Sequence, residues 1–170
     1  MKNQIEIERK FIIERPDISY ILSLEGATAS EITQIYLASG AHVTHRVRER
    51  ITDGAAVYTE TKKVRIDKMS AYEDEREITL AEYLALAENI KEGSRPLKKS
   101  RYTFPHLGLV YEIDVYPEWE HTAIMEVELG RREEDIPSPP FIRVIREVTG
   151  MRKYSNAAMS ERFPDETPLE

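Results

Sequence analysis

The chain alternates apolar and charged residues near its N-terminus, and this period of two is the one at which side chains share a face of a β-strand. If residues 4–13 form a strand, Glu6, Glu8 and Lys10 lie together on one face. The opposite face is apolar and carries Ile5, Ile7, Phe11 and Ile13. Two carboxylates and an ammonium group side by side pack poorly against other residues. They can, however, hold a divalent metal and a polyanion together.

The same alternation returns along the chain in segments rich in Val, Ile, Thr and Tyr, which favour strands. Further strands are predicted at 31–39, 43–51, 55–66, 69–78, 97–104, 108–116 and 122–130. Helices are predicted at 17–25, 80–91, 140–148 and 155–163. For the second helix, Thr79 is the expected N-cap and Glu82 follows three residues later. Many antiparallel strands with few helices indicate an α+β protein built on a closed or nearly closed barrel.

Length and composition limit the class of protein. The chain has 170 residues, which suits one domain spanning 1–170. Its formal net charge is -7, so a nucleic-acid backbone is not an expected partner. It has no Cys, which excludes disulfides and thiolate metal sites. Because no run of 18 apolar residues and no apolar leader occurs, we expect a soluble cytoplasmic protein without a membrane partner.

The charged faces of the predicted strands carry residues of like sign two positions apart. The acids are Glu6, Glu8, Glu75, Glu77, Glu112, Asp114, Glu126 and Glu128. The bases are Lys10, Arg46, Arg48, Lys62, Lys99 and Arg101. A sheet with one solvated face, laced by cross-strand ion pairs, gives the same alternation. If the barrel instead closes with these faces inward, its lumen must hold water, metal and ligand, because unpaired buried charge is costly.

The residue types indicate which ligand such a lumen would take. Guanidinium groups grip phosphate oxygens in bidentate fashion, and Lys supplies a point charge. Carboxylates that cluster without His or Cys favour a hard cation such as Mg²⁺ or Mn²⁺. Bases, a hard metal and a polar lumen together fit a linear polyphosphate.

The segment Glu6-x-Glu8-x-Lys10 resembles the ExExK signature of the CYTH superfamily, the triphosphate tunnel metalloenzymes. Other segments resemble the family's strands in the same order along residues 4–160. They are Gln34-Ile35-Tyr36-Leu37, Arg46-Val47-Arg48, Thr61-Lys62, Glu75-Arg76-Glu77-Ile78, Lys99-Ser100-Arg101-Tyr102, Glu112-Ile113-Asp114-Val115, Glu126-Val127-Glu128 and Lys153-Tyr154-Ser155-Asn156. One departure is Gly150-Met151, where many relatives carry acids, so a contact near the tunnel mouth is expected to be missing.

The resemblance implies an eight-stranded antiparallel tunnel with a few flanking helices, in which Mg²⁺ or Mn²⁺ supports the hydrolysis of triphosphate compounds. It implies that Glu6, Glu8, Glu126 and Glu128 are the principal metal ligands. Glu75, Glu77 and Asp114 would complete a second metal site or position water. The triphosphate would be bound by Lys10, Arg46, Arg48, Lys62, Lys99 and Arg101. Lys99 or Lys62 would protonate the leaving phosphate, and Tyr36 would hydrogen-bond Lys10.

The resemblance is greatest to compact bacterial members of the family, which favour inorganic tripolyphosphate. The resemblance to the family also leads us to expect a homodimer. Three alternatives stay open: a class IV adenylate cyclase, a thiamine or nucleoside triphosphatase, and a non-catalytic module that binds polyphosphate or nucleotide. Cyclisation requires a grip on the nucleoside, and no dedicated pattern for adenine stands out in the sequence.

Overall fold

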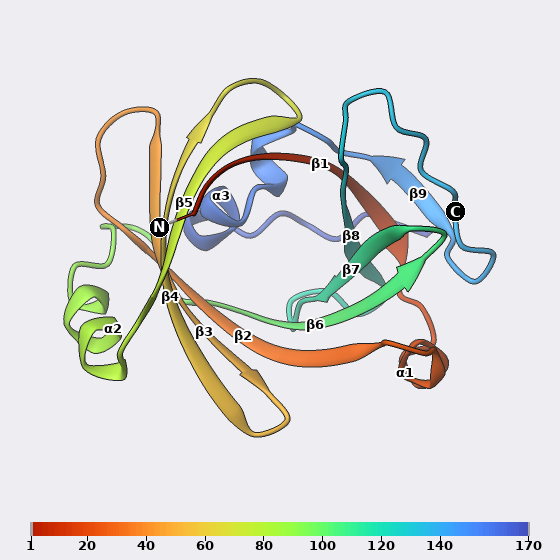
Figure 1. The fold of residues 1–170 in the computed structure, drawn as a ribbon, viewed down its shortest axis with the longest axis horizontal. Helices are drawn as coiled ribbons and strands as arrows, with labels where there is room; N and C mark the ends of the chain where they lie inside the picture. The colour runs from red at the N-terminus through yellow and green to blue at the C-terminus, as the bar shows by residue number, and fades with distance from the viewer. Residues whose placement is uncertain (1, 170) are drawn as a thin grey trace.

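The computed structural model describes residues 2–169 (Figure 1). The strands of this part of the chain are β1 (Lys2–Glu14), β2 (Thr28–Leu37), β3 (Val43–Thr52), β4 (Ala55–Arg65), β5 (Ser70–Ile78), β6 (Leu97–His106), β7 (Leu109–Val115), β8 (Thr122–Glu128) and β9 (Val144–Glu147). The helices are α1 (Ile18–Ser23), α2 (Leu80–Ala87) and α3 (Asn156–Glu161), with a 3-10 turn at Arg152–Tyr154. None of the helices in residues 2–169 has the length and apolar character needed to cross a membrane.

Eight strands close into an antiparallel barrel, as the sequence predicts. Their order is β5-β4-β3-β2-β6-β7-β8-β1, and a further pairing of β1 with β5 completes the ring. The long strand β1 makes this closure possible because its two halves have different partners. Residues 2–7 pair with β5, and residues 8–14 pair with β8.

The predicted helix at 140–148 is wrong, because Val144–Glu147 form β9. This strand pairs antiparallel with residues 11–13 of β1, on the edge that β5 leaves free. The backbone N–H and C=O groups on this edge of β1 need hydrogen-bond partners. Residues 144–147 supply them by adopting an extended conformation. Two β-branched residues, Val144 and Ile145, suit the extended form. Arg9 fixes the position of β9, since its Nε and Nη2 donate to the two carboxylate oxygens of Glu147 at 2.8 and 2.9 Å.

Two apolar clusters cover the outside of the barrel wall. The larger one joins the outward faces of β1, β6, β7 and β8, and it includes Phe11, Phe104 and Tyr111. The other lies under α2, where Tyr83 packs near Val47 and Ile78. α2 begins as predicted, since Thr79 and Glu82 form a capping box, but it ends at Ala87.

A third cluster fills one end of the lumen. It combines inward-facing residues of the strands, such as Ile12 and Tyr116, with Tyr154 and Met159 from the C-terminal segment. α3 lies at the barrel interior in Figure 1 and is capped by Ser155. Burying each large apolar side chain contributes roughly 1.5–3 kcal/mol. The C-terminal segment is thus fixed as a plug, and the remaining lumen is left to charged residues.

Candidate active site

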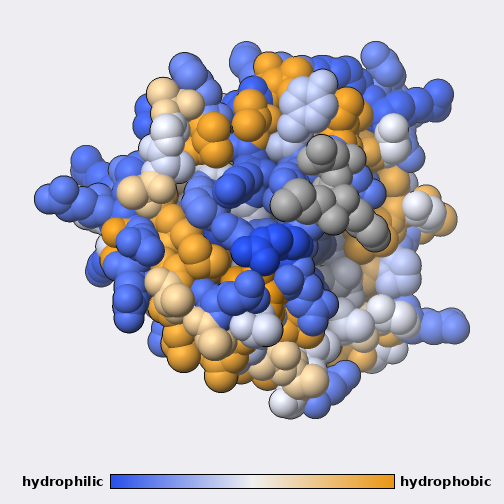
Figure 2. Space-filling view, turned by 60° about the vertical axis from the view of Figure 1, so that its left-hand side comes forward, coloured by the Kyte–Doolittle hydropathy of each residue, from blue (hydrophilic) through white to orange (hydrophobic). Residues whose placement is uncertain are grey.

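Alternate residues of the strands point their charged groups into the lumen. Contacts between strands that are not neighbours show this directly. Lys63 of β4 pairs with Glu6 of β1, although β5 lies between these strands. Arg101 of β6 lies 3.5 Å from Glu126 of β8, across β7. Figure 2 shows a hollow lined with hydrophilic residues and bordered by hydrophobic ones. The charged faces therefore point inward, as the second interpretation of the sequence required.

The deepest part of the lumen holds a buried ionic network beside the apolar plug. Lys99 Nζ lies 2.7 Å from Asp114 Oδ2, and Arg101 donates to both Asp114 oxygens at 2.7 and 2.8 Å. Asp114 is fully buried, and Lys99 is 2% exposed. Burial lowers the pKa of Lys99 to about 8. Although burial alone raises the pKa of Asp114, Arg101 and Lys99 bring it below its usual value.

Glu126 and Lys10 link this network to the middle of the lumen. Lys10 Nζ lies 3.2 Å from Glu126 Oε1 and donates to the Tyr154 carbonyl at 3.2 Å. Burial raises the pKa of Glu126, but Lys10, Arg101 and Lys99 lower it well below the usual range. The Lys10 ammonium is thus held between Glu126 of β8 and the C-terminal plug.

Glu8 has an unfavourable environment for a carboxylate. Burial, followed by repulsion from Glu126, raises its pKa to about 7, and the nearby Lys10 and Lys63 only partly offset this. A hard cation beside Glu8 would relieve both effects, so the chemistry of these acids fits a divalent metal. Even so, no group of three or more His, Asp or Glu side chains within residues 2–169 is arranged to hold a metal. Glu6 and Glu126 are instead paired with Lys63 and Lys10.

The β3 part of the wall presents guanidinium groups to the lumen. Arg46 and Arg48 each place Nη2 near Glu75 Oε2, at 3.9 and 3.7 Å. Their Nε atoms are buried and have no hydrogen-bond partner in the described part of the chain. Burial and the charge of Arg46 lower the pKa of Arg48 to about 10. Unpaired buried donors are costly, so these two side chains are suited to an anionic ligand.

Tyr36 does not take the position expected from the sequence. Its hydroxyl accepts a hydrogen bond from Gln34 Nε2 at 2.9 Å and interacts with Arg46. Those contacts lie on the β2–β3 wall (Tyr36 pairs with Arg46), whereas Lys10 is engaged by Glu126 and Tyr154. Tyr36 is therefore placed to orient Arg46 rather than Lys10.

Lys62 was expected in the lumen, and that expectation is wrong. Lys62 is exposed, while its neighbour Lys63 pairs with Glu6 and lies 3.7 Å from Glu73. The register of β4 explains the difference, because inward-facing Thr61 bonds Glu75 at 2.8 Å. Residues 58, 60 and 62 consequently face outward. Glu60, for example, pairs with His45 and Arg76 on the outer surface.

Two further acids of the predicted metal set lie at the ends of strands. Glu77 shares a face of β5 with Glu75, and Glu128 stands opposite Glu8 in the β1–β8 ladder. Both are exposed. Sequence reasoning also missed Lys63, which pairs with Glu6 and which only the strand pairing reveals. Glu73 shares the alternating face of Glu75 and Glu77, and it lies beside Lys63 in the lumen.

The fold and this site define a class of protein: an eight-stranded tunnel lined with carboxylates, lysines and arginines. No family model and no curated protein sequence matches the chain. Among solved structures, the inorganic triphosphatase NE1496 is similar, with 27% identity and a TM-score of 0.59 over 94% of this chain and 97% of that chain.

Two less similar structures share the fold alone. PH1819 of Pyrococcus horikoshii OT3 has 20% identity and a TM-score of 0.56 over 75% of this chain and 80% of that chain. Protein bh2851 of Bacillus halodurans has 17% identity and a TM-score of 0.53 over 77% and 83%, respectively. With its ordered motifs and closed barrel, the chain is similar to proteins of the CYTH triphosphate tunnel superfamily.

Proposed function

We propose that the protein is a divalent-metal-dependent hydrolase of triphosphate compounds, with inorganic tripolyphosphate as its substrate. The observation that carries this proposal is the lumen itself. Within residues 2–169, the buried Nε donors of Arg46 and Arg48 have no hydrogen-bond partner, and Glu6 and Glu126 lie near Glu8. The similar structure with 27% identity is described as an inorganic triphosphatase, which supports the same activity here.

Substrate binding would fall to the cations of the lumen. We assign this role to Lys10, Arg46, Arg48, Lys63, Lys99 and Arg101, with Lys63 replacing Lys62. Arg46 and Arg48 would hold phosphate oxygens through their guanidinium forks, and Tyr36 would orient Arg46. The ion pairs with Glu75 and Glu6 would have to open as the anion enters.

Glu6, Glu8 and Glu126 are the residues proposed to hold Mg²⁺ or Mn²⁺, with Glu128 at the rim. Such an ion, when bound, would neutralise phosphate oxygens and increase the acidity of water. Glu75 and Glu77 stay in the proposal as weaker candidates for a second metal. Asp114 is better suited to positioning, since both of its oxygens accept hydrogen bonds from Lys99 and Arg101.

Hydrolysis breaks one bridging P–O bond and forms a bond from that phosphorus to the oxygen of water, giving pyrophosphate and orthophosphate. The departing oxygen gains negative charge and benefits from a proton. Lys99 is the proposed donor, because burial brings its pKa to about 8 and a proton can leave it near neutral pH. Lys10 would hold the reacting phosphoryl group, and the water proton would pass to product or solvent.

One observation disfavours nucleotide substrates. Trp119, the single Trp, is 2% exposed and packs edge-on against Tyr116 and Phe163. Its Nε1 donates to the Pro164 carbonyl at 3.0 Å. The ring is therefore buried against the plug and is unable to stack on a base. Cyclase and nucleoside triphosphatase activities stay as alternative outcomes of the assay below.

The test is the release of orthophosphate from tripolyphosphate, ATP and thiamine triphosphate, each with Mg²⁺, Mn²⁺ or EDTA, and with ATP also a search for cyclic AMP. We expect metal-dependent release that is fastest with tripolyphosphate. Faster turnover of ATP or thiamine triphosphate would change the substrate, and a cyclic product would make the protein a cyclase. Tight polyphosphate binding without turnover would identify a binding module.

Cellular location and assembly are part of the proposal as well. We propose that the protein acts in the cytoplasm and forms a homodimer, as the resemblance implies. Light scattering at micromolar concentration checks the assembly, and a mass of one chain would contradict it.

A further inference from the structure

The barrel wall has a gap where β5 and β9 share one edge of β1. β5 pairs with this edge as far as Ile7, and β9 ends opposite Phe11. Between these points the edge is bordered by two loops instead of a strand. Each loop contributes one backbone hydrogen bond: Glu8 N–H donates to the Met69 carbonyl at 3.0 Å, and Val148 N–H donates to the Lys10 carbonyl at 2.8 Å.

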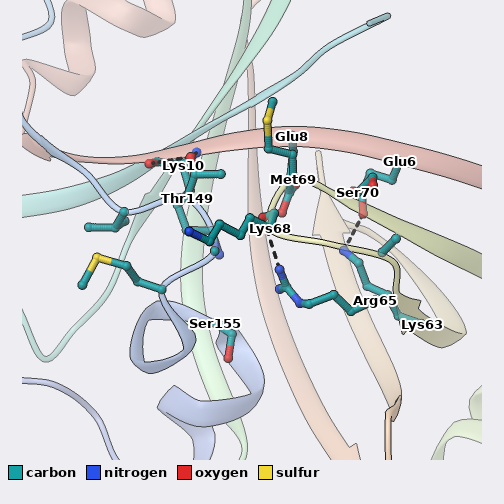
Figure 3. A pocket seen from close by; sticks show the side chains of 14 residues that line it. Glu6, Glu8, Lys10, Lys63, Arg65, Lys68, Met69, Ser70, Thr149 and Ser155 are labelled. Carbon is teal, nitrogen blue, oxygen red and sulfur yellow. Dashed lines mark hydrogen bonds and ion pairs between the residues drawn. The ribbon is translucent and has the colours of Figure 1, made fainter. Parts of the chain in front are cut away.

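A pocket of about 30 Å³ lies in this gap (Figure 3). Glu6, Glu8, Lys10 and Lys63 line it from the tunnel side. Outside it lies a second, larger depression of about 630 Å³, and the two share Lys68, Met69, Thr149 and Met151. The two depressions therefore adjoin at the wall, and Glu8 and Lys10 lie on the inner side of the smaller one.

Lys68 and Gly150 form the narrow point of the smaller depression. A Cβ atom at Gly150 would lie 2.8 Å from Lys68 Cβ, and the φ angle of Gly150 is 73°. Only Gly allows the two loops to approach so closely. Arg65 Nη1 donates to the carbonyls of Asp67 and Lys68 at 3.2 and 3.3 Å, which holds the turn that carries Lys68. Figure 3 shows the Lys68 side chain lying across the pocket.

The pocket is lined by four cations, Lys10, Lys63, Arg65 and Lys68, and by two acids, Glu6 and Glu8, so its balance of charge suits a small oxyanion. Lys10 and Lys63 stand at its inner end, and Lys68 stands at the narrow point. Lys10 and Lys63 are engaged by Glu126 and Glu6, whereas Lys68 is exposed and forms no ion pair within residues 2–169. The narrow part has room for about two water molecules, so an anion would pass only when the Lys68 side chain moves aside.

One end of the lumen is closed, so a product formed there needs another way out. Beyond Lys10 the lumen is filled by the cluster that includes Ile12, Tyr116 and Tyr154. An orthophosphate formed beside Lys10 would otherwise have to pass the pyrophosphate still held by Arg46 and Arg48. We propose that the gap between β5 and β9 is an orthophosphate site through which this product leaves, with Lys68 holding it at the narrow point; the inference rests on the proposed function.

Lys68→Ala tests the site, with inorganic orthophosphate as the probe. Its binding is measured by calorimetry without substrate and, separately, as product inhibition of tripolyphosphate hydrolysis. We expect Lys68→Ala to weaken orthophosphate by about two- to fivefold in both, the effect of one exposed charge. The KM for tripolyphosphate should stay unchanged. Lys98→Ala removes an exposed lysine from the outer face of β6 and should change neither value.

A cysteine variant distinguishes the effect of the positive charge of Lys68 from the effect of the space that its side chain fills. The chain has no Cys, so Lys68→Cys gives a single thiol on an exposed position. Aminoethylation rebuilds a cation of lysine length and should restore orthophosphate binding, whereas carboxymethylation should not.

The outcomes distinguish this inference from the proposed function. Normal hydrolysis with unchanged orthophosphate binding in Lys68→Ala overturns the exit site alone. Weakened binding with rescue by aminoethylation, in a protein that hydrolyses no triphosphate, supports the phosphate site and overturns the hydrolase. Weakening without rescue assigns Lys68 a structural role and also overturns the exit site.

Discussion

Replacing Glu8 with Gln should stabilise the metal-free protein while removing its activity. Folding raises the pKa of Glu8 from 4.5 to about 7, so the folded state disfavours the carboxylate. This penalty is absent at pH below about 4.5, grows as the pH rises, and is complete above about pH 7, where it reaches at most about 3 kcal/mol. It is an upper limit, because the Glu8 side chain is partly exposed and water screens part of the repulsion.

The assay is thermal unfolding in EDTA at pH 5 and pH 8. For a chain of this length, the gain at pH 8 corresponds to a rise in Tm of several degrees, at most about 10 °C. The gain at pH 5 should be much smaller. Glu118→Gln, at an exposed turn position, is the control and should leave Tm unchanged. A lower Tm for Glu8→Gln at pH 8, or equal gains at both values, would refute the argument.

Three further predictions concern the lumen cations and their buried partner. Lys63→Ala should raise the KM for tripolyphosphate about tenfold or more, as expected for the loss of a charge–phosphate contact in the lumen, while Lys62→Ala should leave it unchanged in steady-state kinetics. Asp114→Asn leaves Lys99 and Arg101 buried without their carboxylate, so urea unfolding should show a loss of about 3–5 kcal/mol; a neutral effect would contradict the role of the network. The folded pKa of Asp114 is lowered from 3.8, so its contribution is present above that pH and is lost as the pH falls below it. Stability measured between pH 5 and pH 2 should fall for the wild type, and less steeply for Asp114→Asn.

Where one side of a strand is apolar, the sequence correctly predicts which face of the strand points into the lumen. In β1, Phe11 and Ile13 have to join the outer cluster, which leaves Glu6, Glu8 and Lys10 in the lumen. Hydrophobic burial thus decides which face of the strand points inward. The resemblance to known motifs then adds the order in which the charged strands occur.

In β4, the sequence pattern does not show which face of the strand points into the lumen. Both of its faces are polar around residues 58–63, so alternation fails to distinguish Lys62 from Lys63. The face is decided by pairing with β3 and β5, in which Thr61 lies opposite Arg46 and Glu75. Such a register depends on residues far away in the chain, and a local pattern contains no information on it.

The error at 140–148 has a related cause. Prolines before a short apolar run are typical of a helix start, but here Val144–Glu147 complete the exposed edge of β1. The gap between β5 and β9, with Lys68 close to Gly150, also arises only from the meeting of these distant segments. A tertiary requirement for hydrogen bonds overrides the local preference in this region.

The most direct test of the account is the rate of orthophosphate release from tripolyphosphate by the wild type and by Glu8→Gln, with Mg²⁺ and then with excess EDTA. The account predicts rapid release by the wild type that EDTA abolishes, and a loss of at least about a hundredfold in Glu8→Gln, as expected when a metal-binding carboxylate is removed. Equal rates for the two proteins, or release that EDTA does not affect, would contradict the assignment of the charged tunnel as a metal-dependent triphosphatase site.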